Sequence, residues 1–233
     1  MGYIFSPPET PSVAIDGSED RFPVRRIFCV GRNYAAHARE MGKDPDREPP
    51  FFFTKPADAV CDSGSTVPYP PLTSNLHHEI ELVVAIGVTA RNVSVENAHS
   101  VIWGYGVGID LTRRDLQLAA RDLGRPWDWG KAFDFSAPCG PLRPIGKTGF
   151  IESGAIRLEV DGTERQAADI QDLIWSVPEI INYCSASVTL QPGDLIFTGT
   201  PAGVASVGPG DHLVGAITGL PDVEIIIGRV EGQ

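Results

Sequence analysis

The 233-residue sequence has few cysteines, a deficit of positive charge and no long apolar segment. Its four cysteines, Cys29, Cys61, Cys139 and Cys184, include no CxxC pair, which favours buried thiols of a cytoplasmic protein over a disulfide framework. Nineteen Lys and Arg against 30 Asp and Glu give a net charge of −11, which argues against a nucleic-acid or anionic-membrane partner. The longest good apolar run, residues 82–90, is too short to span a bilayer, and the first residues lack the pattern of a signal peptide. We therefore expect a soluble, cytoplasmic protein.

Glycine and proline are plentiful, with 25 and 20 residues, and they separate many short β-type runs. Clear strand patterns occupy residues 26–31, 78–87 and 104–111, and helix patterns occupy residues 34–41 and 113–123. Many short strands with Gly and Pro turns and only a few helices predict a β-rich α+β fold. We expect a proline-rich arm over residues 1–25 and a single catalytic domain over residues 26–233.

Two carboxylates lie two residues apart in the most apolar predicted strand. Side chains at this spacing share one face of a strand, so Glu79 and Glu81 would lie close together. Such a pair is poorly solvated and repulsive unless a cation joins it, and carboxylate oxygens favour Mg²⁺, Mn²⁺ or Ca²⁺. The alternative is a half-exposed strand whose glutamates face water while Ile80 and Leu82 face the core.

Asp110 ends a glycine-rich strand and precedes a helix pattern. A carboxylate there is placed to turn towards a site, but Asp is also a common helix N-cap.

His37 and Glu40, at i and i+3 of a predicted helix, would share a face. A carboxylate that orients a histidine makes it a general base near neutral pH; the alternative is a solvated surface pair. The sequence contains no GxSxG motif, which would indicate a serine nucleophile, and its His and Cys residues lack the spacing of a zinc site.

Six segments together resemble the fumarylacetoacetate hydrolase family, and within it the short-chain acylpyruvate hydrolases. The resemblance covers nearly the whole chain, from about residue 24 to residue 230, and rests on GRNYAAHAREMG (31–42), FFFTKPADAV (51–60), NLHHEIEL (75–82), GYGVGIDLTRRDLQ (104–117), the PW…GKAFD stretch (126–134) and GDLIFTGTPAGV (193–204).

The resemblance implies a mixed β-roll, a homodimer and one Mg²⁺ or Mn²⁺ per subunit. By match of motif, the metal ligands would be Glu79, Glu81 and Asp110. His37 and Glu40 would form the dyad that activates water. Lys131, Arg114 and Gln117 would contact substrate oxygens, and Thr200 would hold the substrate carboxylate.

The implied reaction is hydrolysis of a small 2,4-diketo acid, with fumarylpyruvate favoured and with a role in gentisate-type aromatic degradation. The second carboxylate of fumarylpyruvate needs a cation, for which Arg32, Arg113 and Lys55 are candidates. An acetyl or longer acyl group would instead need an apolar wall, for which residues 51–53, Trp127 or Trp129 are available. Two alternatives remain open: decarboxylation of oxaloacetate or a related 2-oxo acid, and a non-catalytic protein that binds a metal–oxoacid complex.

Overall fold

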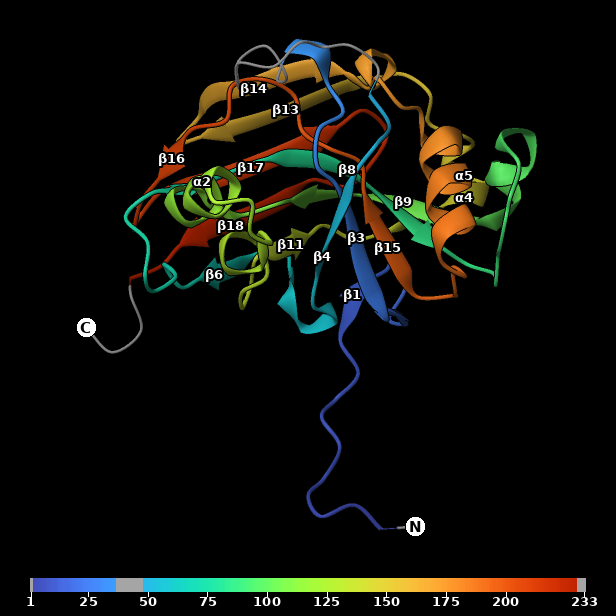
Figure 1. Ribbon diagram of the computed structural model, residues 1–233, viewed down its shortest axis with the longest axis horizontal. Coiled ribbons are helices and arrows are strands. Elements are labelled where there is room, and N and C mark those ends of the chain that lie inside the picture. Colours follow the sequence, from blue (N-terminus) through green and yellow to red (C-terminus); the bar gives the residue numbers. More distant parts are fainter. Residues whose placement is uncertain (1, 37–47, 230–233) are drawn as a thin grey trace.

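A mixed sheet of eight strands forms the centre of the computed structural model, which describes residues 2–36 and 48–229 (Figure 1). Seven of its strands follow one another in the order β4 (Phe52–Lys55), β3 (Arg26–Val30), β15 (Asp194–Phe197), β8 (Ile80–Ile86), β9 (Ile102–Ile109), β11 (Ala137–Cys139) and β5 (Val60–Asp62). The short strand β12 (Arg143–Pro144) pairs separately with β9. Strands β8 and β9 are antiparallel and place Glu81 opposite Gly108.

A second sheet of five strands packs against the first in the described part of the chain. Its order is β14 (Thr163–Asp169), β13 (Ala155–Val160), β17 (His212–Ile217), β18 (Val223–Ile227) and β6 (Ser65–Val67). A small sheet joins β10 (Thr112–Arg113), β7 (Leu76–His77) and β16 (Ser206–Val207). The segment expected as an arm contains a hairpin of β1 (Ser12–Ala14) and β2 (Arg21–Pro23), and the residues before β1 extend away from the body (Figure 1).

Short helices lie between the strands along the chain. They are α2 (Arg114–Asp122), α3 (Asp128–Lys131), α4 (Ile145–Thr148) and α5 (Val177–Ser187), with 3₁₀ turns at η1 (Ala57–Ala59), η2 (Val95–Val101) and η3 (Ile170–Asp172). Helix α5 begins with a capping box, in which Glu179 accepts a hydrogen bond from the backbone N–H of Ser176. No helix in residues 2–36 or 48–229 has the length and apolar character needed to cross a membrane.

Strand β8 is buried on both faces, which decides where its glutamates point. Ile80, Leu82 and Val84 belong to a large apolar cluster with β13, β17 and α5. Val83 and Ala85 belong to a second cluster on the other face, with β3 and β15. Glu79 and Glu81 are both buried, so the alternative in which the two glutamates face water is wrong.

The α+β fold with a curled sheet agrees with the sequence-based prediction. The strands predicted at 26–31, 78–87 and 104–111 correspond to β3, β8 and β9, and the helix predicted at 113–123 corresponds to α2. The other predicted helix, 34–41, extends into residues 37–47, which lie outside the described residues.

Candidate metal and substrate site

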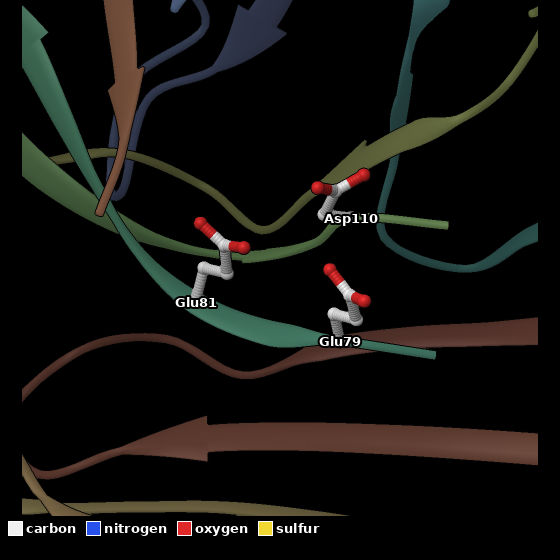
Figure 2. Close-up of side chains that lie close together, drawn as sticks. All are labelled: Glu79, Glu81 and Asp110. Carbon is white, nitrogen blue, oxygen red and sulfur yellow. The ribbon is translucent and has the colours of Figure 1, made fainter. Parts of the chain in front are cut away.

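Three carboxylates meet where β8 and β9 pair (Figure 2). Glu79 immediately precedes β8, and Asp110 follows β9; the backbone N–H of Asp110 donates to the carbonyl of Glu79 at 2.8 Å. Glu79, Glu81 and Asp110 each offer one carboxylate oxygen, and these oxygens all lie within 4.8 Å of one another. The exposed fractions of the three residues are 5, 1 and 0 %. Antiparallel pairing thus brings together carboxylates separated by about 30 positions in the chain.

Asp110 does not cap helix α2, which was the alternative left open by the sequence. The N-cap of α2 is Arg113, and it makes no side-chain capping hydrogen bond. Asp110 instead forms ion pairs with two lysines: Lys55 Nζ lies 2.8 Å from Oδ1, and Lys131 Nζ lies 2.6 Å from Oδ2. Its carboxylate therefore belongs to the buried charged cluster and not to the helix end.

The buried carboxylates fit a divalent cation. Burial, and then the charges of Asp110 and Glu79, raise the pKa of Glu81 well above its usual value. A cation held by all three carboxylates would offset this repulsion, and three hard oxygen donors suit Mg²⁺ or Mn²⁺. Among the described residues, this is the group of His, Cys, Asp and Glu side chains whose spacing suits a metal ion.

Two buried lysines adjoin the carboxylates, and their pKa values shift in opposite directions. Lys131 Nζ contacts Glu79 at 2.7 Å, Asp110 at 2.6 Å and the Thr112 hydroxyl at 2.7 Å. Burial opposes the charge of Lys131, but the carboxylates of Asp110 and Glu79 outweigh it and raise the lysine's pKa. Burial lowers the pKa of Lys55 in spite of its pairing with Asp110. Lys131, which contacts two of the three carboxylates, is therefore the better placed of the two lysines to stabilise negative charge.

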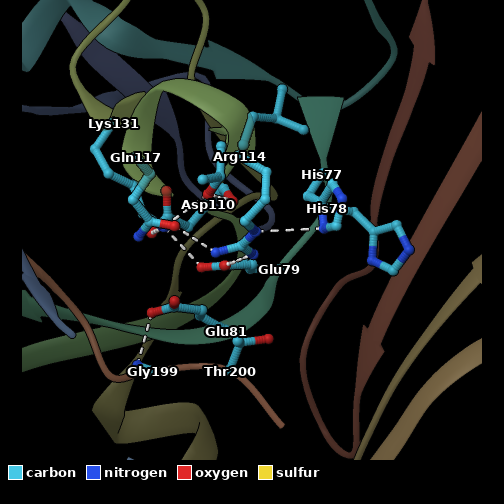
Figure 3. Close-up of polar contacts among 12 residues, drawn as sticks. His77, His78, Glu79, Glu81, Asp110, Arg114, Gln117, Lys131, Gly199 and Thr200 are labelled. Carbon is cyan, nitrogen blue, oxygen red and sulfur yellow. Dashed lines mark hydrogen bonds and ion pairs between the residues drawn. The ribbon is translucent and has the colours of Figure 1, made fainter. Parts of the chain in front are cut away.

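Arg114 connects the triad to helix α2 (Figure 3). One guanidinium nitrogen bonds to Glu79 and another donates to Gln117 Oε1 at 2.5 Å, so the amide nitrogen of Gln117 stays available as a donor. His77 Nδ1 lies 3.4 Å from Arg114 Nε. Burial, and then the Arg114 charge, lower the pKa of His77 to about 4, so this ring is neutral near pH 7.

A glycine allows Lys131 to lie next to Gln117. A Cβ atom on Gly130 would lie 2.8 Å from both the backbone nitrogen and the Cβ of Gln117. Real Cβ atoms essentially never approach other atoms that closely, so a side chain at position 130 would separate α3 from α2. This close approach places Lys131, Arg114 and Gln117 beside one triad, as the sequence-based interpretation requires.

The loop after β15 closes another side of the site. The backbone N–H of Gly199 donates to Glu81 Oε2 at 2.7 Å, and Thr200 follows it with an exposed fraction of 3 % (Figure 3). The Thr200 hydroxyl is 2.8 Å from the amide nitrogen of Gln166 on β14. Gln166 was not found from the sequence, because a single glutamine in a strand carries no recognisable pattern.

Arg32 lines a cavity of about 510 Å³ that Lys131 also lines. The apolar part of its wall includes Phe51, Phe53 and Trp127. The other two cations considered for the distal carboxylate do not line this cavity. Lys55 pairs with Asp110, and the Arg113 guanidinium lies 4.4 Å from the centre of the Phe133 ring. Trp129 is 76 % exposed and does not line this cavity.

The predicted dyad, His37 and Glu40, lies outside the described residues. The chain that leads to it is anchored by Asn33, which is fully buried. The Asn33 side chain accepts from the Trp175 backbone N–H at 2.6 Å and donates to the carbonyls of Trp175 and Thr198, each at 2.8 Å. These bonds hold the end of β3 against the loop that follows β15.

Residues 26–227 match the family model described as fumarylacetoacetate (FAA) hydrolase C-terminal. A crystal structure of fumarylpyruvate hydrolase from Pseudomonas aeruginosa in complex with Mn²⁺ and pyruvate is 53 % identical in sequence, with a TM-score of 0.96. The match covers 98 % of this chain and 100 % of that one.

Curated relatives carry two activities. Fumarylpyruvate hydrolase of Ralstonia sp is 47 % identical over 193 residues, which is 82 % of this chain and all of the relative. Oxaloacetate tautomerase YcgM of Escherichia coli (strain K12) is 40 % identical over 193 residues, covering 82 % of this chain and 88 % of the relative.

Proposed function

The chain belongs to the fumarylacetoacetate hydrolase family, and we propose that it hydrolyses a carbon–carbon bond of an acylpyruvate, converting fumarylpyruvate to fumarate and pyruvate. The observation that carries this proposal is the buried carboxylate triad with Lys131 paired to two of its members, Glu79 and Asp110. The likeness to fumarylpyruvate hydrolases over nearly the whole chain supports the choice of substrate.

Glu79, Glu81 and Asp110 would hold one Mg²⁺ or Mn²⁺ per subunit. When bound, the ion supplies Lewis acidity to the carboxylate and 2-keto oxygens of the substrate. We infer that His37, oriented by Glu40, takes a proton from the water that attacks the C4 carbonyl. The C3–C4 bond then breaks, its electron pair passes to the departing pyruvate as an enolate, and a proton returned to C3 completes pyruvate.

The substrate-facing cations and donors hold the charge that this cleavage releases. Lys131 remains protonated beside the triad and donates to the developing enolate oxygen, which is stabilisation at the atom where charge appears. Arg114 and the amide of Gln117 orient the keto oxygens, and the Thr200 hydroxyl holds the carboxylate end. Burial of these groups strengthens each interaction by excluding water.

Arg32 is proposed to bind the distal carboxylate of fumarylpyruvate. It lines a cavity that Lys131 also lines, whereas Lys55 and Arg113 do not line it and Lys55 is paired with Asp110. The aromatic side chains of Phe51 and Trp127 line the same space and suit the flat, unsaturated chain between the two ends of the substrate.

The first experiment is a substrate screen under metal control. The purified protein is treated with EDTA, restored with Mg²⁺ or Mn²⁺, and given fumarylpyruvate, acetylpyruvate and oxaloacetate. Loss of the diketo absorbance and release of pyruvate are followed together. Metal-dependent turnover that is fastest with fumarylpyruvate supports the proposal, and its absence with every acylpyruvate contradicts it.

Oxaloacetate tautomerisation is a second candidate, because the YcgM relative carries that name and the reaction also passes through an enolate. It requires proton transfer at C3 but no attack by water, so oxaloacetate would interconvert its keto and enol forms without loss of carbon. Enol decay without pyruvate release identifies tautomerisation. Pyruvate formed from oxaloacetate, with release of carbon dioxide, would instead identify the decarboxylase alternative.

The role of Arg32 is tested by comparing two substrates. Arg32→Met should raise KM for fumarylpyruvate about tenfold or more, because a charge-assisted bond is lost. It should leave KM for acetylpyruvate, which has no distal carboxylate, nearly unchanged. The exposed Arg91→Met serves as the matched control. Equal effects of Arg32→Met on both substrates would contradict the assignment.

We also propose that the protein is a cytoplasmic homodimer. Its four cysteines are free thiols, which fits a reducing compartment. Helices α2 and α3 present an apolar groove of about 680 Å³, lined by Leu116, Leu123 and Trp129 on the side of α2 opposite Arg114. Leu123 and Trp129 are 63 and 76 % exposed, which is unusual for apolar side chains that meet no partner.

Sedimentation velocity tests the dimer. The wild-type chain is expected at twice the monomer mass, and Trp129→Glu is expected to shift it towards the monomer, because a buried unpaired charge opposes association. The exposed Phe150→Glu lies outside the groove and controls for added charge. A monomeric wild-type protein at micromolar concentration would contradict the proposal.

A further inference from the structure

Gln166, on β14, makes four hydrogen bonds next to the candidate site although it is only 1 % exposed. Its carbonyl oxygen Oε1 lies 3.1 Å from the backbone nitrogen of Ile80 and 2.9 Å from His78 Nδ1. Its amide nitrogen Nε2 lies 2.8 Å from the Thr200 hydroxyl oxygen and 2.9 Å from the carbonyl oxygen of Pro201. The side chain therefore links the start of β8 to the loop that follows β15.

Backbone groups at both ends fix which way the Gln166 amide faces. The oxygen and nitrogen of an amide side chain are otherwise interchangeable by a flip. The Ile80 N–H can only donate, so Oε1 must face it, and the Pro201 carbonyl can only accept, so Nε2 must face that side. His78, which is fully buried, must then donate from Nδ1 to Oε1.

The orientation of Gln166 determines what the Thr200 hydroxyl can do. Because Nε2 has only hydrogens to offer, the Thr200 oxygen accepts its bond from Gln166 and keeps its own proton for another partner. Within the described residues the Thr200 hydroxyl donates no hydrogen bond. The neighbouring Gly199 N–H is bound to Glu81, so Thr200 lies directly beside the carboxylate triad (Figure 3).

We propose that Gln166 is a positioning residue that keeps the Thr200 hydroxyl as a hydrogen-bond donor to the carboxylate of the 2-oxo acid. The inference rests on the proposed function, because it assumes that Thr200 receives that carboxylate. Two buried backbone groups fix the orientation of Gln166 before the substrate arrives, so little ordering remains for binding to accomplish. Gln166 itself touches no substrate and acts only through Thr200.

A double-mutant cycle tests this coupling, with pyruvate as the probe. Pyruvate binding to the Mn²⁺-loaded protein is measured by calorimetry for the wild type, Thr200→Val, Gln166→Met and the double variant. Thr200→Val is expected to weaken binding about 10- to 100-fold, since a hydrogen bond to a charged group is lost. Gln166→Met is expected to weaken it about tenfold, and to add little in the Thr200→Val background. Thr200→Ser should recover most of the affinity lost in Thr200→Val.

The outcomes separate positioning from a general structural role. The proposal would be overturned if the fold-losses in pyruvate affinity of the two single variants multiply in the double variant. It would also be overturned if Gln166→Met binds pyruvate as tightly as the wild type. Gln191→Met, which removes an exposed hydrogen bond to Thr89 and touches none of the candidate site residues, is the matched control and should not change binding. If Gln166→Met does not fold, Gln166→Glu takes its place. Its carboxylate keeps an acceptor for Ile80 and His78, and its second oxygen accepts a hydrogen bond from the Thr200 hydroxyl. Thr200 then has no proton left for the substrate, so the same non-additive loss is expected.

Pyruvate binding also keeps this inference separate from the proposed reaction. A wild-type protein that binds pyruvate but does not cleave fumarylpyruvate would contradict the hydrolase proposal, while the cycle would still measure the coupling between Gln166 and Thr200. A cleaving enzyme with an additive cycle would contradict the role of Gln166 alone. KM for fumarylpyruvate, measured on the same variants, should rise in parallel with the dissociation constant for pyruvate while kcat changes less.

Discussion

The backbone N–H of Gly199 donates a hydrogen bond to Glu81 Oε2 at 2.7 Å, which joins the loop after β15 to one member of the carboxylate triad. Gly199 has a φ of +97°, and a Cβ atom there would lie 2.7 Å from the Cβ of Asn33. The residue is therefore held between the triad on one side and the end of β3 on the other, and only glycine fits without displacement.

Gly199→Ala should consequently lower both stability and metal affinity. We expect a loss of about 1–3 kcal/mol in the free energy of unfolding, from the unfavourable φ and the contact with Asn33. The displaced N–H would also no longer orient Glu81, so Mn²⁺ binding should weaken by calorimetry. Gly162→Ala, at a φ of +71° with open space around it, is the control. It should cost stability but leave Mn²⁺ affinity unchanged; a similar loss of affinity in both variants would argue against the link.

Glu81→Gln should abolish tight binding of Mn²⁺ and Mg²⁺ together with activity. The substitution keeps the volume of the side chain but removes a charge that is 1 % exposed and that no other described carboxylate replaces. Calorimetric titration measures the affinity, and Asp62→Asn, which breaks a surface ion pair with Arg21, is the control. An unchanged Mn²⁺ titration would show that Glu81 is not a ligand.

Lys131→Met should separate catalysis from metal binding. Loss of the ammonium group removes the charge proposed to stabilise the enolate, and kcat should fall about 100- to 1000-fold. Mn²⁺ affinity should be retained or increased, because Glu79 and Asp110 lose a competing cation. Stability without metal should fall, since two buried carboxylates lose a partner. Lys147→Met, at a lysine near the surface, controls for the loss of charge; a kcat within threefold of the wild type in Lys131→Met would refute the catalytic role.

Stability should decline at alkaline pH because of buried thiols. Burial, and then the negative charge of Asp62, raises the pKa of Cys61 to about 12 from a usual value of 9.0. Burial, and then the charge of Asp194, raises the pKa of Cys184 to about 12 in the same way. Above about pH 9 the unfolded chain therefore binds fewer protons than the folded protein, so the free energy of unfolding falls as pH rises towards 12. Below pH 9 both states keep these protons and the effect is absent.

Urea unfolding midpoints between about pH 8 and pH 11 measure this decline, which linkage limits to about 1.4 kcal/mol per pH unit for each thiol. A Cys61→Ala, Cys184→Ala double variant should start less stable but show a flatter decline than the wild type. Parallel curves for the two proteins would mean that other groups, such as the buried Tyr105, are responsible.

Residue spacing along the sequence predicted local features of the site correctly. The spacing of Glu79 and Glu81 predicted a shared face, which is a local consequence of a two-residue period. The apolar character of the strand suggested a cation between them, but the pattern alone left open a strand whose glutamates face water. The helix pattern at 113–123 likewise predicted α2, whose first turns hold Arg114 and Gln117. Family motifs added the association of these residues with Asp110, Lys131 and Thr200, which no spacing along the chain can show.

Other parts of the site depend on contacts between segments far apart in sequence. Lys55 was expected as a candidate for the distal end of the substrate, yet it pairs with Asp110, because the position of β4 relative to β9 is decided by sheet order and not by local pattern. Gln166 meets Thr200 only because β14 of one sheet lies beside the loop from the other. The sequence by itself predicted which residues are candidates for the chemistry and determined that two of them share one face of a strand. The tertiary structure alone decided which cations neutralise which carboxylates, because charge pairing in a buried site depends on distances that only packing sets.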